Sequence, residues 1–159
     1  MRFPDLDRPA VLALNAAHVT ETGPLSAAEL DRLLALAFHA EAPRDAQGRL
    51  LGFVTALEHD RPDWPSLPYG WFRARGGRFV YVDRIVVAPA ARGTGTAARL
   101  YEGLFAAARA AGHARVCAEV NLEPPNPVSM RFHERMGFAE VGRGPLPSGK
   151  TVRYLERPL

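Results

Sequence analysis

One segment, residues 85–100, constrains the fold more than any other part of the chain. A β-branched run ends a predicted strand there, and Pro89 and Arg92 lead into Gly93 and Gly95, which precede an alanine-rich helical run. Amides at a helix N-terminus point outward, the helix dipole is positive at that end, and glycine lets an anion approach the backbone without meeting a Cβ. The segment therefore predicts a strand, an anion-binding loop and a helix in succession.

Two ligand patterns compete for this loop. Residues 93–98 match G-x-G-x-x-A, the dinucleotide fingerprint, and Glu119 lies near the spacing at which that fold places an acidic ribose ligand. In that fold, however, the first glycine follows its strand almost at once, whereas residues 89–92 intervene here and the strand lies in mid-chain. A glycine-rich turn that merely starts a helix is a third interpretation.

A second stretch, residues 126–138, favours the other ligand pattern. After Val87-x-Pro89, residues 92–97 read R-x-x-G-x-A, and residues 126–138 read N-x-x-S-x-x-F-H-x-x-x-G-F. Both motifs, in this order and spacing, resemble those of the GNAT acetyltransferases. The resemblance covers residues 79–143 well, extends to the N-terminal half only in the order of elements, and points to a bacterial branch with an unassigned substrate.

The resemblance implies both a fold and an activity. The expected fold is a single α/β GNAT domain over residues 1–159, with a mixed, strongly bent sheet and helices on both faces. The expected activity is transfer of an acetyl group from acetyl-coenzyme A to a primary amine by direct attack in a ternary complex. A module that binds coenzyme A or acyl-coenzyme A without useful turnover remains open, and a dinucleotide oxidoreductase is a more distant alternative.

Carried over position by position, the resemblance assigns the loop and its flanks to the cofactor. Main-chain groups of residues 85–87 would meet the pantetheine arm, and an amide there would polarise the thioester carbonyl. Asn126 would both cap a helix and face the pantetheine. The residues expected to contact acetyl-coenzyme A are Ile85, Val86, Val87, Arg92, Gly93, Thr94, Gly95, Thr96, Ala97, Asn126, Ser129 and His133.

His133 is the predicted general acid. It stands where many GNAT enzymes carry a tyrosine that protonates the coenzyme thiolate. An imidazolium can donate this proton, because an unperturbed pKa of about 6.5 leaves a protonated fraction near neutrality. A structural role for a histidine on a helix is the alternative.

Glu119 is the predicted general base. An alkylamine with a pKa near 10.4 is protonated at pH 7, so a carboxylate should help to remove that proton. Glu119 and the following valine resemble the E-V pair that supplies the base in ribosomal-protein N-terminal acetyltransferases, although Pro124 and Pro125 lengthen the loop before the motif asparagine. Asp83 is the second candidate, and a plain ion pair with Arg84 is its alternative.

Composition bounds the remaining possibilities. The chain has 159 residues, enough for one domain with a core. Its single cysteine, Cys117, excludes an internal disulfide and favours a cytoplasmic location. Cys117 lies in a predicted buried strand, so its thiol is expected to be buried. No run approaches the ~20 apolar residues of a membrane span. A net charge of +3 with dispersed Lys and Arg favours an anionic cofactor over nucleic acid, and the five histidines show no metal-ligand spacing. A homodimer remains open.

Hydrophobic periodicity and turn residues predict the elements. Residues 58–78, rich in Pro, Gly and aromatic residues, are predicted to form a long loop. This loop serves as an acceptor-site wall or a dimer contact, or it merely packs on the surface. Core positions of the first helix are Val11, Leu12, Leu14 and Ala16. The predicted helices are 9–19, 27–38, 94–111 and one capped by Asn126 and ended by Gly137, and the predicted strands are 38–42, 50–58, 79–87, 114–121, 138–143 and 150–157.

Overall fold

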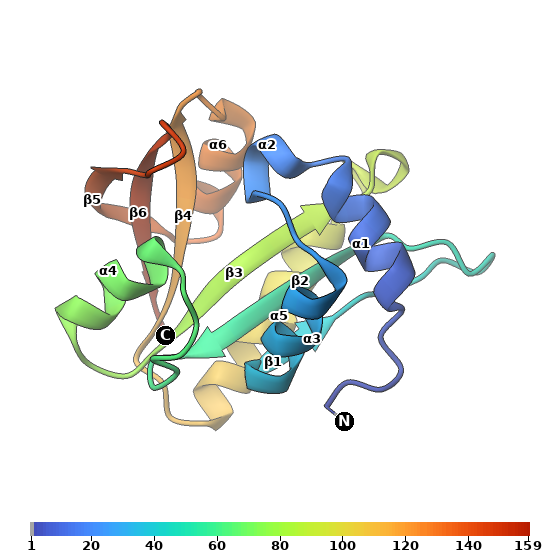
Figure 1. Cartoon of the computed structure of the whole chain (residues 1–159), viewed down its shortest axis with the longest axis horizontal. Coiled ribbons are helices and arrows are strands. Elements are labelled where there is room, and N and C mark those ends of the chain that lie inside the picture. The colour runs from blue at the N-terminus through green and yellow to red at the C-terminus, as the bar shows by residue number, and fades with distance from the viewer. Residues whose placement is uncertain (1) are drawn as a thin grey trace. The chain divides into compact units, whose positions relative to one another are not determined.

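The computed structural model describes residues 2–159 as a mixed α/β fold (Figure 1). Its strands pair in the order β1-β2-β3-β4-β6-β5, with β3 and β4 parallel and the pairs β1–β2, β4–β6 and β5–β6 antiparallel. The elements are α1 (Arg8–Ala16), α2 (Val19–Thr22), α3 (Ala27–Leu36), β1 (His39–Glu41), β2 (Gly52–Glu58), α4 (Leu67–Arg75), β3 (Phe79–Val87), the 3-10 turn η1 (Pro89–Ala91), α5 (Thr96–Ala110), β4 (Arg115–Glu123), α6 (Pro127–Arg135), β5 (Ala139–Pro145) and β6 (Thr151–Pro158).

The chain forms two compact units. The first comprises the chain up to Leu57 together with Val82–Ala107, and the second comprises Glu58–Tyr81 and Ala108–Leu159. A single domain over residues 1–159 stays a prediction.

In the first unit, α1 and α3 cover one face of β2 and β3, and α5 lies on the other (Figure 1). Both of these helices have a side-chain N-cap. At the start of α1 the Asp7 carboxylate accepts from the Ala10 amide at 3.0 Å, and at the start of α3 the Ser26 hydroxyl accepts from the Glu29 amide at 3.1 Å. Their apolar sides meet the sheet in one cluster, which consists of Val11, Leu30, Leu34, Phe53 and Val86.

The first helix differs from its prediction in length and in one core position. It ends at Ala16 rather than at residue 19, and a separate helical turn, α2, follows it before α3. Leu12 and Leu14 pack against the cluster as expected, but Ala16 is exposed and Asn15 is buried in its place. The buried amide is tolerated because it bonds to other polar groups, as described below.

In the second unit, the predicted long loop contains the helix α4. The Ser66 hydroxyl accepts from the Tyr69 amide at 3.3 Å, and Pro68 occupies the first turn, where its missing N–H costs nothing. Tyr69 and Phe72 are buried, and the Trp71 ring stacks on the Tyr154 ring of β6 with 4.0 Å between centroids. The loop prediction for residues 67–75 was therefore wrong, because the burial of Tyr69 and Phe72 stabilises a helix there.

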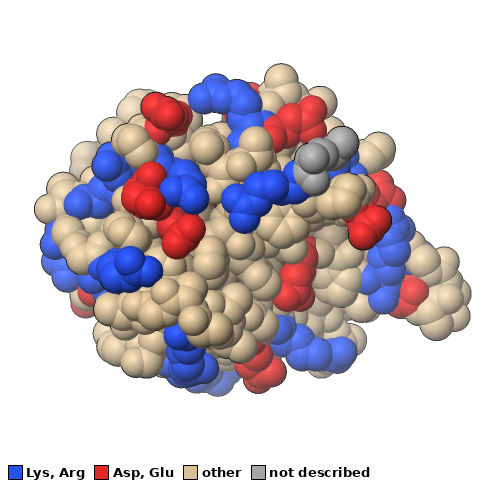
Figure 2. Space-filling view, turned by 90° about the horizontal axis from the view of Figure 1, so that it is seen from below, with Lys and Arg blue, Asp and Glu red and all other residues tan. Residues whose placement is uncertain are grey.

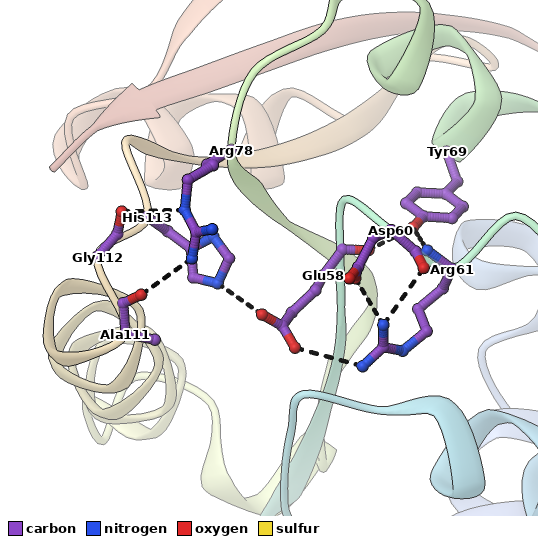
Figure 3. A network of polar contacts seen from close by, with 8 residues as sticks. All are labelled: Glu58, Asp60, Arg61, Tyr69, Arg78, Ala111, Gly112 and His113. Carbon is purple, nitrogen blue, oxygen red and sulfur yellow. Dashed lines mark hydrogen bonds and ion pairs between the residues drawn. The ribbon is translucent and has the colours of Figure 1, made fainter.

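A polar network fixes the segment before α4 (Figure 3). The Arg61 guanidinium lies 2.6 Å from the Asp60 carboxylate and 3.4 Å from that of Glu58. The Tyr69 hydroxyl accepts from the Arg61 amide at 2.9 Å and donates to the Glu58 carbonyl. The Glu58 carboxylate also lies 2.9 Å from Nε2 of His113, which is buried. These contacts hold residues 58–61 against α4 and the start of β4.

Basic and acidic side chains are interspersed on the face shown in Figure 2 rather than gathered into one basic patch. Across residues 2–159, every helix is too short or too polar to cross a membrane. The same residues contain no group of three or more His, Cys, Asp or Glu side chains placed to hold a metal ion. Cys117 is fully buried, as predicted.

Candidate functional site

The loop between β3 and α5 has the backbone of an anion site. Gly93 and Gly95 have φ values of +76° and +83°, in the left-handed region that favours glycine. No atom lies within 4 Å of the position that a Cβ would take at either glycine. Because of these two turns, α5 begins at Thr96 rather than at the predicted residue 94.

Several amides of this loop have no protein acceptor. Within residues 2–159, the N–H groups of Gly93, Gly95, Thr96 and Ala97 donate to no carbonyl or side chain. The Thr94 hydroxyl donates to the Ala91 carbonyl and lies 2.9 Å from the Thr96 hydroxyl, which fixes the loop from within. Successive free amides at the positive end of a 15-residue helix suit a diphosphate.

Arg92, at the entrance to the loop, is held by a histidine that the sequence did not single out. His18 Nδ1 lies 2.9 Å from the Leu14 carbonyl, which can only accept, so Nδ1 carries the ring proton. His18 Nε2 lies 3.2 Å from the Arg92 guanidinium, which can only donate, so Nε2 accepts this hydrogen bond. This contact positions a cationic side chain beside the free amides.

Asp83 forms the ion pair that its neighbour suggested. Arg84 Nε donates to the Asp83 carboxylate at 2.8 Å, and the two side chains are 9% and 5% exposed respectively. The same guanidinium donates to the Asn15 side chain at 3.0 Å and to the Gly23 carbonyl at 3.4 Å. The pair thus joins β3 to α1 and to the end of α2, and a base role for Asp83 stays a prediction.

Glu119, the predicted base, lies on β4 in the second unit. The Tyr81 hydroxyl donates to Glu119 Oε1 at 2.9 Å. Tyr154 of β6 is the cross-strand partner of Glu119, and such partners project from the same face of the sheet. The carboxylate is thus flanked by two phenols, one on each neighbouring strand.

The α6 residues make mostly structural contacts. The Asn126 side chain accepts from the Ser129 amide at 3.3 Å, which confirms the predicted cap. His133 is 4% exposed, and its Nδ1 donates to the Ser129 carbonyl at 2.8 Å. Burial lowers the pKa of His133, so the ring is neutral at pH 7. The general-acid role of His133 stays a prediction, against which this burial counts.

The structure groups the predicted residues by unit. Residues 85–87 and 92–97 belong to the first unit with Asp83, and Glu119, Asn126, Ser129 and His133 belong to the second. Sequence reasoning missed Tyr81 and Tyr154. Tyr81 carried a weak signal, because it precedes Asp83 by two on the same predicted strand. Tyr154 carried none, because only the pairing of β4 with β6 brings it beside Glu119.

The fold and the loop define a class: a mixed α/β protein whose strand–loop–helix segment suits the diphosphate of a nucleotide cofactor. The model of the acetyltransferase (GNAT) family matches residues 13–138, so the chain belongs to this family of acetyltransferase enzymes. The family uses acetyl-coenzyme A to acetylate amines. The family resemblance, the mixed α/β fold class and the enzyme class predicted from sequence are confirmed.

Individual relatives agree with this assignment. Acetyltransferase Atu2258 of Agrobacterium fabrum is 36% identical over 85 residues, a match that covers 53% of this chain and 58% of that relative's length. The structure of Ard1 from Thermoplasma volcanium has a TM-score of 0.75 at 16% identity, covering 100% of this chain and 95% of its own. A chain of the NatC complex bound to Gag peptide and CoA has a TM-score of 0.74 at 17% identity. The match covers 96% of this chain and 90% of that chain. At these identities the structures show the fold alone.

Proposed function

We propose that this chain transfers the acetyl group of acetyl-coenzyme A to a primary amine by direct attack in a ternary complex. The observation that carries the proposal is the run of free amides at Gly93, Gly95, Thr96 and Ala97, which fits a diphosphate. The NatC complex, one chain of which has a similar fold, was crystallised with CoA bound. The family match supports acetyl transfer as the use of that cofactor.

In this proposal, the loop amides and Arg92 bind the diphosphate, and the backbone of residues 85–87 orients the pantetheine arm. Bound acetyl-coenzyme A supplies a thioester, whose carbonyl carbon is the electrophile. Glu119 takes a proton from the acceptor's ammonium group, which leaves a neutral amine with a lone pair for attack. Tyr81 fixes the Glu119 carboxylate through its hydrogen bond, so the base is already oriented before the acceptor arrives.

A cofactor-binding module without turnover is the second candidate. The observation that favours it is the burial of His133, since a neutral ring bonded to the Ser129 carbonyl is a poor proton donor at pH 7. In this alternative the loop still binds acetyl-coenzyme A, but no amine is acetylated.

Glu119→Gln tests the proposal. We expect kcat for acetylation of a panel of primary amines, measured as thiol release, to fall at least about 100-fold at pH 7, because a positioned general base contributes about that much or more. Acetyl-coenzyme A affinity, measured by calorimetry, should not change.

Glu123→Gln is the matched control, because Glu123 is an exposed carboxylate at the end of the same strand. It should leave both kcat and cofactor affinity at wild-type values. If the wild-type protein binds acetyl-coenzyme A but releases no thiol with any amine, the binding module is correct. If Glu119→Gln retains full activity, the assignment of the base is wrong.

A further inference from the structure

Tyr154 has a hydroxyl group that the fold does not use. The residue is 2% exposed, and its ring stacks on Trp71 at 4.0 Å and 14° and meets Phe72 edge-on at 5.5 Å. Within residues 2–159, no group donates to its hydroxyl or accepts from it. The ring is buried while the hydroxyl oxygen reaches solvent, so the hydroxyl is open to a ligand.

The unused hydroxyl belongs to a row of polar groups across three adjacent strands. Tyr81 on β3 donates to Glu119 on β4 at 2.9 Å, and Tyr154 on β6 is the direct cross-strand partner of Glu119. Burial and, second, the negative charge of Glu119 raise the pKa of Tyr154, so its phenol is protonated at pH 7. A carboxylate beside a free phenol oxygen offers two acceptors to a group with several N–H donors, which a primary ammonium is.

The rings beside this row indicate what the ammonium group is attached to. Trp71 is partly exposed and stacks on the Tyr154 ring, so it adds apolar surface beside the residue that pairs with Glu119. Arg75 lies over Trp71 at 5.3 Å from the ring centroid, and Glu156 neutralises it at 3.0 Å. An apolar stem gains contact with these rings, whereas a polar stem loses hydration there.

We infer that Tyr154 binds the acceptor, its hydroxyl oxygen accepting a hydrogen bond from the ammonium group of a primary amine that is carried on an apolar stem. The inference rests on the proposed function. Glu119 takes one proton from the ammonium, the nitrogen lone pair forms the N–C bond, and the C–S bond breaks with its electron pair on sulfur. A second nitrogen proton neutralises the thiolate, so the products are an amide and free coenzyme A.

Tyr154→Phe removes only the unused hydroxyl. We expect the KM for phenethylamine to rise about 10- to 100-fold at saturating acetyl-coenzyme A, the usual effect of a lost hydrogen bond to a charged group. The melting temperature and acetyl-coenzyme A affinity should stay at wild-type values, because the hydroxyl makes no bond within the fold. A purely structural role would not separate KM from stability in this way.

Two further variants sharpen the test. Tyr101→Phe makes the same chemical change at a buried tyrosine of α5, outside the row, and should leave the KM for phenethylamine unchanged. Gly144→Ala leaves the phenol intact but adds a Cβ 3.3 Å from the Tyr154 hydroxyl and ring edge. It should raise the same KM, by less than Tyr154→Phe does, because the methyl group obstructs the approach to the hydroxyl.

The outcomes separate this inference from the proposed function. If the wild-type protein acetylates phenethylamine with a lower KM than ethanolamine and Tyr154→Phe raises that KM, the inference holds. If the wild type is active but Tyr154→Phe keeps its KM, or ethanolamine is the better acceptor, the inference is wrong and the proposed function stands. If the wild type acetylates no amine, both are wrong.

Discussion

At the scale of single residues, burial decides which titratable groups can do chemistry. Cys117 lies in the core, and burial raises its thiol pKa to about 12, so it is not a nucleophile at neutral pH. His133 is also buried, and its ring proton is committed to the Ser129 carbonyl. Glu119 differs, because its strand leaves it partly exposed while the Tyr81 hydroxyl orients it. The sequence presents all three as reactive types, and only their surroundings distinguish them.

His133 predicts a pH dependence of stability. Its folded pKa is lowered below the unfolded value of 6.5, so the unfolded chain binds a proton more readily. The contribution of His133 to stability should therefore be fully present above about pH 6.5 and be lost as the pH falls through 6.5 toward the folded pKa. Urea unfolding from pH 8 to pH 5 measures this loss.

His133→Gln keeps a donor for the Ser129 carbonyl but does not titrate. Below pH 6.5, the free energy of unfolding of this variant should fall less steeply with falling pH than that of the wild type. The two slopes should differ by the equivalent of up to one proton bound on unfolding. At pH 8, where His133 is neutral in both the folded and the unfolded wild-type chain, the difference between the two proteins provides the reference. Equal slopes for the variant and the wild type would show that His133 charges as freely when folded as when unfolded.

At the scale of elements, local signals and long-range packing carry different information. The caps of α1, α3 and α6 are encoded by Asp7, Ser26 and Asn126 within three residues of the amides they bind, so they are visible in the sequence. Helix α4 was missed, because its proline and central Gly70 suggest a loop. What stabilises it is the burial of Tyr69 and Phe72, which the local pattern does not reveal.

The loop before α5 yields a prediction at this scale. Gly95 and Gly112 flank α5, both have positive φ (+83° and +79°), and both have open space where a Cβ would lie. Changing either to alanine should therefore cost a similar amount of stability, about 1 kcal/mol from the left-handed backbone alone. Gly95→Ala should also weaken acetyl-coenzyme A binding about tenfold or more, because the loop amides turn away from the diphosphate.

Gly112→Ala is the matched control for Gly95→Ala. Chemical denaturation compares the stabilities, and isothermal titration with acetyl-coenzyme A compares the affinities. Equal cofactor affinities for the two variants would show that the loop does not bind the diphosphate.

At the scale of the whole molecule, ligand binding to the folded chain should raise its melting temperature. At 100 times its dissociation constant, acetyl-coenzyme A should add about 2.7 kcal/mol to the free energy of unfolding. For a chain of this size that corresponds to roughly 5–10 °C. NAD and NADP at the same concentrations should have no effect, because the loop belongs to the GNAT pattern and not to the dinucleotide fold. A shift with NAD instead would restore the dinucleotide interpretation of residues 93–98.

The sequence by itself determined the strands, four of the helices, the glycine loop and the family, because these depend on local periodicity, caps and the spacing of short motifs. It also identified Glu119 as a candidate base, since residue type and strand position were enough. Only the tertiary structure decided that α4 is a helix, that His133 is buried and neutral, and that Tyr154 lies beside Glu119 with a free hydroxyl. These outcomes depend on contacts between residues far apart in the chain, and such contacts leave no pattern among neighbouring residues.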